Sequence, residues 1–169
     1  MDSGNVKKNY DQSTNRSVVY LVPHTHYDAI WVFTKEDYFY INIELILKQV
    51  VDIIKSHNEY KFTIEQTFLL EHIESNYPKL FADITNFIKQ GRIEIAGGQY
   101  LLCDVMLPHG EVLIREISES KTYVNNKFDQ KNIVVAWGAD EFGFNAPMAT
   151  NSVRLRLQVL CIQKRSRRS

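Results

Sequence analysis

Apolar, strand-like segments alternate with segments of helical periodicity along most of this chain, and this alternation restricts the possible folds more than any other feature. The periodicity predicts helices over about residues 36–57, 77–90 and 111–128, and Gly91 is expected to end the second. The strand-like segments lie at about residues 17–23, 61–65, 92–96 and 132–137.

This order of elements predicts an α/β fold with a parallel sheet. Helical crossovers between parallel strands are right-handed, so the carboxyl ends of all the strands meet at one edge of the sheet. Ligands bind at that edge both in open sheets and in barrels. Candidate functional residues are therefore sought just after each strand.

Composition narrows the classes of protein that the chain can belong to. The 169 residues carry 20 basic and 20 acidic side chains and are 44% hydrophobic, which is enough for one globular core. The sequence before residue 149 has no long basic tract typical of nucleic-acid binding. It also lacks the apolar core of a signal peptide and an apolar run of membrane-spanning length. Cys103 and Cys161 do not form a disulfide framework. We therefore expect a cytoplasmic protein without a nucleic-acid or membrane partner.

The two ends of the chain differ from its centre. Residues 1–16 are polar and are expected to form a disordered lead-in. Residues 149–169 carry six basic side chains and no acidic one. We interpret 149–169 as a basic tail that does not continue the native fold. A tail that binds nucleic acid or an anionic surface is the alternative.

The sequence His24-Thr25-His26-Tyr27-Asp28 follows the first apolar segment. Alternate residues of an extended chain lie on one face, so His24, His26 and Asp28 are predicted to project the same way. Two imidazoles and a carboxylate are ligands that suit a zinc-type ion. The alternative is two polar residues that end a strand beside a turn aspartate.

Polar residues also follow the other predicted strands. Glu65 and Gln66 lie at the end of the second predicted strand. The third predicted strand is followed by Gly97 and Gly98 and then by the polar residue Asp104. Asp140 and Glu141 follow the fourth predicted strand. Loops are commonly polar, which accounts for some of these residues, but carboxylates or imidazoles at several strand ends favour a site there.

Four stretches of the chain resemble the N-terminal catalytic domain of the family 38 glycoside hydrolases, the α-mannosidases. They are VPHTHYDAIW (22–31), FTIEQTFLLEHIESNYPKLFADITNFIKQGRIEIAGGQY (62–100), LPHGEVLIRE (107–116) and WGADEFGFNAPM (137–148). The family's catalytic domain is a seven-stranded β/α barrel. The resemblance thus implies that residues 17–148 form a partial parallel β/α barrel with about its first four β/α units.

The resemblance also implies a function and a site. It implies a retaining α-mannosidase that binds one zinc ion, with another divalent ion as an alternative, and a mannose-containing oligosaccharide as substrate. Asp140 would be both nucleophile and metal ligand, and His26 and Asp28 would be further ligands. His24 would support these ligands without binding the ion. Trp31, Phe142 and Asp104 are candidates for substrate binding, and a turn role for Asp104 is equally compatible with the sequence.

The family's remaining histidine ligand and its general acid/base aspartate would lie beyond residue 169, so we expect this chain by itself to be inactive. Two other functions stay open. One is a different metal-dependent hydrolase with HxH on its first strand, such as an amidohydrolase. The other is a non-catalytic metal- or carbohydrate-binding fragment. A homo-oligomeric full-length protein is also compatible with the sequence.

Overall fold

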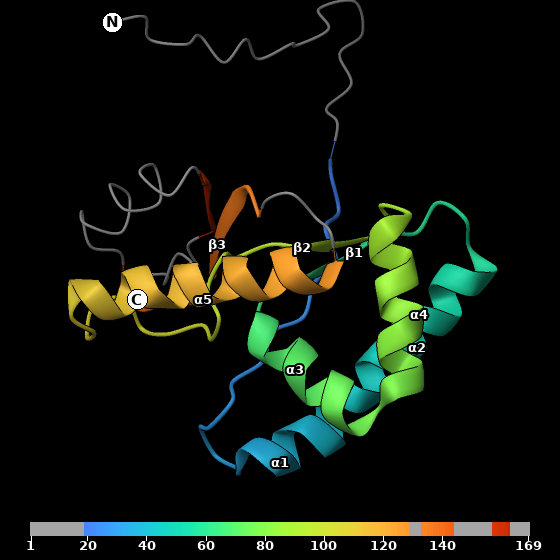
Figure 1. The fold of residues 1–169 in the computed structure, drawn as a ribbon, viewed down its shortest axis with the longest axis horizontal. Coiled ribbons are helices and arrows are strands. Elements are labelled where there is room, and N and C mark those ends of the chain that lie inside the picture. Colours follow the sequence, from blue (N-terminus) through green and yellow to red (C-terminus); the bar gives the residue numbers. More distant parts are fainter. Residues whose placement is uncertain (1–18, 129–132, 144–156, 163–169) are drawn as a thin grey trace, which may run out of the picture.

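The computed structural model describes residues 19–128, 133–143 and 157–162. The described helices are α1 Lys35–Tyr38, the π-helical turn η1 Phe39–Ile43, α2 Glu44–Ser56, α3 Thr67–Asn76, α4 Pro78–Lys89 and α5 Gly110–Phe128. The described strands are β1 Phe62–Ile64, β2 Ile93–Ile95, β3 Val135–Ala139 and β4 Gln158–Ile162. Helices α1 to α4 lie together below and to the right of β1 and β2 in Figure 1.

The strands pair in parallel, as the sequence predicts. β1 pairs with β2, with Thr63 opposite Glu94, and β3 pairs with β4, with Trp137 opposite Leu160. The two pairs are linked where β2 ends, because the Gly97 N–H donates to the Val135 carbonyl at 3.0 Å. The result is an α/β structure with small parallel sheets, whereas the closure of a barrel is not tested by these elements.

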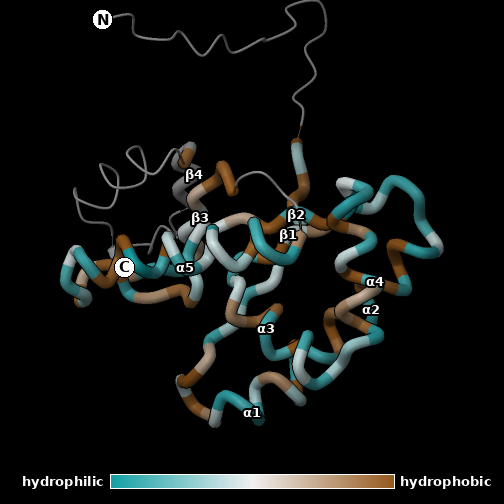
Figure 2. Tube along the Cα trace, in the orientation of Figure 1, coloured by the Kyte–Doolittle hydropathy of each residue, from teal (hydrophilic) through white to brown (hydrophobic). Residues whose placement is uncertain are grey.

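The first predicted strand is the main correction to the expected fold. Of residues 17–23, those from 19 onward are described, and they form no strand; a single bridge pairs His24 with Thr63. The prediction of a strand here was wrong for the described residues, and Val19, Tyr20 and Leu21 are largely exposed. The Pro23 carbonyl accepts the Thr63 N–H of β1 at 3.0 Å, and the described residues before Pro23 extend in Figure 2 as a largely hydrophobic segment away from the helices.

The helices begin and end at residues whose chemistry favours those positions. Thr34 caps α1 by accepting the Asp37 N–H at 3.2 Å. Pro78 begins α4, where its missing N–H is not needed, and Gly91 follows that helix with φ +66°. The single helix predicted over 36–57 contains the π-helical turn η1, and helix α3 was not predicted.

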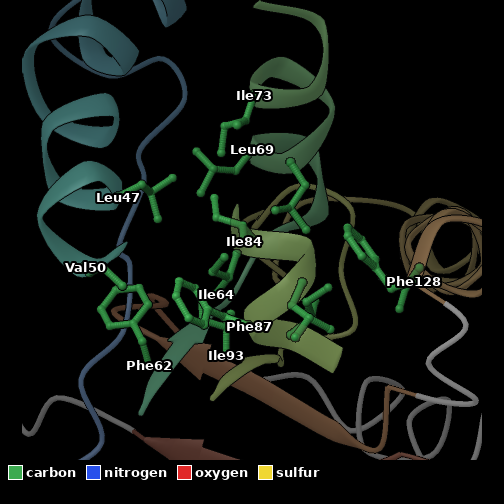
Figure 3. Packing of buried hydrophobic residues seen from close by; sticks show 14 of the residues in the cluster. Leu47, Val50, Phe62, Ile64, Leu69, Ile73, Ile84, Phe87, Ile93 and Phe128 are labelled. Carbon is green, nitrogen blue, oxygen red and sulfur yellow. The ribbon is translucent and has the colours of Figure 1, made fainter. Parts of the chain in front are cut away.

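The hydrophobic core lies between the helices and one face of β1 and β2. Figure 3 shows Leu47 of α2, Leu69 of α3 and Ile84 of α4 directed toward Ile64 of β1. All four side chains are fully buried. Burial of apolar surface on this scale is the main stabilising contribution to a domain of this size. The packing of the core against β1 fixes the direction of this strand. It therefore also fixes the position of Glu65, which follows the strand directly.

Residues 158–162, which form β4, contribute to the parallel strand pairing. β4 lies within the segment that we interpreted as a non-native tail, yet it pairs with β3 along its whole length. The interpretation of residues 149–169 as a non-native tail, and with it the boundary at 148, stays a prediction. None of the helices in the described ranges is long and apolar enough to cross a membrane.

Candidate active site at the strand ends

Hydrogen bonds join the 23–28 segment to the carboxyl end of β1. The Thr25 N–H donates to the Thr63 carbonyl at 3.1 Å, and the Thr63 N–H donates to the Pro23 carbonyl at 3.0 Å. The Glu65 N–H donates to the Thr25 hydroxyl at 3.3 Å. Gln66 donates its amide N–H to the Tyr27 carbonyl at 2.8 Å. The segment is therefore held in one register against β1.

Side chains in this segment alternate between the interior and the surface. Thr25 and Tyr27 are buried, and the Tyr27 hydroxyl donates to the Lys35 carbonyl at 3.0 Å. Burial raises the pKa of the Tyr27 phenol to about 12. His24, His26 and Asp28 alternate with these two buried residues along the chain and are partly exposed. The alternation predicted from the sequence is thus present although the segment is not a full strand.

The structure brings together the three residues that the resemblance implied as metal ligands. The Nε2 atom of His26 lies 3.7 Å from Asp28 Oδ1 and 3.8 Å from Asp140 Oδ2. His26 and Asp28 follow the bridge to β1, whereas Asp140 follows β3 more than a hundred residues later. The parallel sheet is what makes these distant residues neighbours.

The other ring nitrogen of His26 contacts a buried carboxylate. His26 Nδ1 lies 3.2 Å from Glu65 Oε1, and Glu65 is fully buried at the end of β1. This hydrogen bond raises the pKa of His26, burial lowers it, and the charges of Glu65, Asp28 and Asp140 raise it further, with a net increase. Three carboxylates thus create a negative environment around the His26 ring, which favours a cation.

His26, Asp28 and Asp140 carry the kinds of donor atom that bind a divalent metal ion. Zinc lies about 2.0–2.2 Å from nitrogen and oxygen ligands, so two donors on the same ion stand about 3.3–3.6 Å apart in a tetrahedral arrangement. The two distances from His26 exceed that spacing by a few tenths of an ångström. In the described ranges, no group of three or more His, Cys, Asp or Glu side chains is arranged so that it could hold a metal ion. The three residues therefore suit the ion by the chemistry of their donor atoms, whereas their spacing in this structure does not form a metal site.

Asp140 occupies an unusual backbone conformation. Its φ is +60°, and it is the only described non-glycine residue with a positive φ. Aspartate tolerates this left-handed region better than most residues. The conformation turns the chain directly after β3 ends at Ala139. Left-handed residues of this kind are concentrated at functional sites.

His24 lies beside the cluster of His26, Asp28 and Asp140 and is not part of it. Its Nδ1 atom donates to the Thr25 carbonyl at 2.7 Å and lies 3.4 Å from Glu65 Oε2. Its ring packs against the buried Trp137 ring with centroids 4.9 Å apart. These contacts place His24 next to Glu65, and its supporting role stays a prediction.

The three residues predicted to bind substrate are found in different settings. Trp31 and Phe142 are 73% and 90% exposed, on the two loops that carry Asp28 and Asp140. Asp104 accepts the Met106 N–H at 3.1 Å through its side chain, which forms a local turn. The turn role is therefore present for Asp104, and its contact with a substrate stays untested.

Sequence reasoning missed a second polar cluster beside Asp140. The amide of the buried Gln99 donates to Glu141 Oε1 at 3.4 Å, and its oxygen accepts the Cys103 N–H at 3.2 Å. Burial raises the pKa of Glu141 to about 7, partly offset by Gln99 and reinforced by Asp104. Only the position of Gln99 after the Gly97-Gly98 pair could have drawn attention to it.

A groove of about 850 Å³ lies away from these residues, where the strands begin. It is lined by Pro23, Phe62, Arg92 and their neighbours. None of the strand-end carboxylates or histidines lines it. The groove therefore has no part in the chemistry considered for the strand-end site.

Comparison with known proteins gives a consistent family assignment. Residues 16–167 match the model of the glycosyl hydrolases family 38 N-terminal domain, a match that extends past residue 148. The chain is 28% identical over 149 residues to alpha-mannosidase 2 of Arabidopsis thaliana, covering 86% of this chain and 12% of that protein. It thus spans a small part of the length of this relative.

Solved structures support the fold. An alpha-mannosidase from Enterococcus faecalis V583 superposes with a TM-score of 0.72 at 22% identity, over 82% of this chain and 15% of that one. A 4-alpha-glucanotransferase from Thermococcus litoralis superposes with a TM-score of 0.57 at 18% identity, over 66% and 18% of the two chains. The fold alone is therefore shared with an enzyme named for a different reaction. The family match over most of the sequence is more specific, and it shows that this chain belongs to glycosyl hydrolase family 38, within the N-terminal domain of that family.

Proposed function

We propose that this chain carries the metal-binding and nucleophile-bearing part of a zinc-dependent retaining α-mannosidase. The observation that carries the proposal is the approach of His26 Nε2 to Asp28 and Asp140 at 3.7 and 3.8 Å. One imidazole and two carboxylates are an appropriate donor set for zinc, and other divalent ions are alternatives. The family relationship supports glycoside hydrolysis as the chemistry.

In this proposal Asp140 performs the first displacement. A carboxylate oxygen of Asp140 forms a bond to the anomeric carbon of the sugar while the bond to the leaving oxygen breaks. A general acid gives that oxygen its proton, and water later cleaves the ester and returns the Asp140 carboxylate. The bound ion would supply Lewis-acid contacts to sugar hydroxyls.

The metal also accounts for a preference for mannose. The 2-hydroxyl of mannose is axial, so the 2- and 3-hydroxyls lie on the same side and can bind one ion together. Trp31 and Phe142 would offer aromatic surfaces to the ring, as is common in ligand sites. A mannose-containing oligosaccharide is therefore the proposed substrate class.

We further propose that the 169-residue chain alone does not hydrolyse α-mannosides. Glu141 follows Asp140 directly and is engaged by Gln99, which makes it a poor proton donor to the opposite side of the sugar. General acid catalysis typically contributes about 10²–10⁴-fold. Cytoplasmic residence also stays a prediction, and partners other than the glycan are not proposed.

The proposal is tested by sugar binding in the presence and absence of zinc. The purified chain is titrated with methyl α-mannoside and with methyl α-glucoside, which differs only at carbon 2, and binding is followed by saturation-transfer NMR. We expect zinc-dependent binding of the mannoside and weaker binding of the glucoside. Asp28→Asn should abolish the zinc dependence, whereas Asp52→Asn on the exposed side of α2 should not alter it.

Three outcomes would count against the proposal. Equal binding of both sugars would remove the mannose preference. Sugar binding with the same affinity in the presence and absence of zinc would favour a non-catalytic carbohydrate-binding module. Zinc binding without any sugar binding would favour another metal-dependent hydrolase. The same chain incubated with zinc and an aryl α-mannoside should release aryl alcohol no faster than its Asp140→Asn variant.

A further inference from the structure

Glu65 is a buried carboxylate without a full set of partners. Its side chain has no exposed surface. One oxygen, Oε1, accepts from His26 Nδ1 at 3.2 Å. The other, Oε2, lies 3.4 Å from His24 Nδ1 but has no hydrogen-bond partner within the described ranges. A buried carboxylate oxygen left in this state is unfavourable and calls for an explanation.

No lysine or arginine of the described residues forms an ion pair with Glu65. Its only charge partners there are the two imidazoles of His24 and His26. Buried charges in folded proteins are ordinarily paired or coordinated to a metal. The missing positive charge would be supplied on the far side of the His26 ring, where Asp28 and Asp140 converge.

We propose that Glu65 is a positioning residue, which fixes the ring orientation and tautomer of His26 and strengthens the binding of a divalent cation by that histidine. This inference rests on the proposed function, since it concerns the same site. With the Nδ1 proton committed to Glu65, the lone pair of Nε2 remains available between the two aspartates. A carboxylate behind a ligating imidazole also increases its basicity as a ligand.

The backbone around Glu65 is built to hold the carboxylate in place. The Glu65 N–H donates to the buried Thr25 hydroxyl, and the neighbouring Gln66 is tied to the Tyr27 carbonyl. On the other side, a Cβ atom added to Gly97 would stand 2.3 Å from the Glu65 carbonyl oxygen. The close approach of Gly97 leaves Glu65 little freedom to move away from His26.

The test combines two measurements on the purified chain. The first is the ¹⁵N chemical shifts of the His26 ring in the metal-free protein, at a pH where the ring is neutral. The second is zinc affinity by competition with a chromophoric chelator. Glu65→Gln keeps the size of the side chain and removes its charge. Glu71→Gln is the matched control, because Glu71 bonds Tyr100 and does not contact His26.

We expect wild-type His26 to be protonated at Nδ1 and Glu65→Gln to show a mixture of tautomers. We also expect Glu65→Gln to bind zinc about 10–100-fold more weakly, as is typical when the partner of a ligating histidine is removed. Glu71→Gln should leave both quantities near their wild-type values. If Glu65→Gln does not fold, as judged by circular dichroism, Glu65→Asp replaces it. This variant keeps the negative charge, but its shorter side chain moves the carboxylate away from the His26 ring by the length of one methylene group.

An unchanged ring tautomer together with an unchanged zinc affinity in Glu65→Gln would overturn the inference. Absence of zinc binding by the wild-type chain would instead count against the proposed function. In that case the ring shifts alone decide the positioning role, because they are measured without metal. A wild-type ring protonated at Nε2 would overturn it.

Discussion

At the scale of single residues, the site depends on side chains that local patterns predict and on one contact that they do not. The alternation of His24, His26 and Asp28 could be predicted because it follows from extended backbone geometry. The contact between His26 and Glu65 joins residues that are 39 positions apart. Its prediction requires the register between the 23–28 segment and β1, which a single sequence does not contain.

Gly97 provides the first prediction, since it combines a positive φ of 93° with a close approach to Glu65. We expect Gly97→Ala to lower the free energy of unfolding by about 2–4 kcal/mol, because strain and a backbone clash add. Urea denaturation of the purified variants measures this effect.

Two other glycines serve as controls that distinguish the effect of a positive φ from the effect of a close backbone contact. Gly91 has a φ of +66° but no atom within 4 Å of an added Cβ, so Gly91→Ala should cost only about 1 kcal/mol. Gly110 has neither feature, so Gly110→Ala should stay within about 0.5 kcal/mol of wild type. Equal losses at Gly97 and Gly91 would show that the approach to Glu65 is unimportant.

At the scale of elements, long amphipathic helices could be predicted and short ones could not. The extents of α4 and α5 agree with the sequence within about a residue. Helix α3 was missed because its ten residues follow β1 after only two residues, Glu65 and Gln66, with no turn signal between them. The π-helical turn η1 was missed because an apolar stripe continues through it, from Phe39 to Ile43.

The junction between α2 and α4 yields a pH-dependent prediction. Glu44 accepts hydrogen bonds from Lys48 and, at 2.7 Å, from the Tyr77 hydroxyl. The Lys48 bond first, and the Tyr77 bond second, lower the pKa of Glu44. A carboxyl group with a lowered pKa in the folded state stabilises the fold above its unfolded pKa, and this contribution is lost as the pH falls through the folded value.

We therefore expect Glu44→Gln to lower the free energy of unfolding by about 1 kcal/mol at pH 7 and by much less at pH 3. Urea denaturation at both pH values checks this. Glu111→Gln removes a comparable pair with Arg115 on an exposed helix surface and should change little at either pH. A loss at Glu44 that is as large at pH 3 as at pH 7 would contradict the account.

Packing of α2 gives a further prediction, because the helix offers two leucines in opposite environments. Leu47 is fully buried, whereas Leu45 is 54% exposed. Leu47→Ala should cost about 2–5 kcal/mol in thermal or urea unfolding, since it leaves a cavity beside β1. Leu45→Ala should cost less than about 1 kcal/mol, and similar losses at both positions would show that α2 does not pack as described.

At the scale of the whole molecule, the sequence predicted an α/β fold with parallel strands, whereas the site at the strand ends stays a prediction. Alternating strands and helices were enough to predict parallel pairing, and parallel pairing placed Asp140 near His26. The first strand was predicted wrongly because an apolar run of strand-like residues is typical of a buried strand, whereas Val19, Tyr20 and Leu21 are exposed. Burial depends on neighbouring strands, and the apolar run alone does not reveal whether those strands are in contact.

The central claim is that His26, Asp28 and Asp140 bind one divalent ion together. Zinc bound per chain, measured by elemental analysis after equilibrium dialysis at fixed free zinc, tests it most directly. We predict one equivalent for the wild type and for Asp52→Asn, and strongly reduced binding for His26→Ala, Asp28→Asn and Asp140→Asn. One equivalent retained by all three site variants, or none taken up by the folded wild-type chain, would contradict the claim.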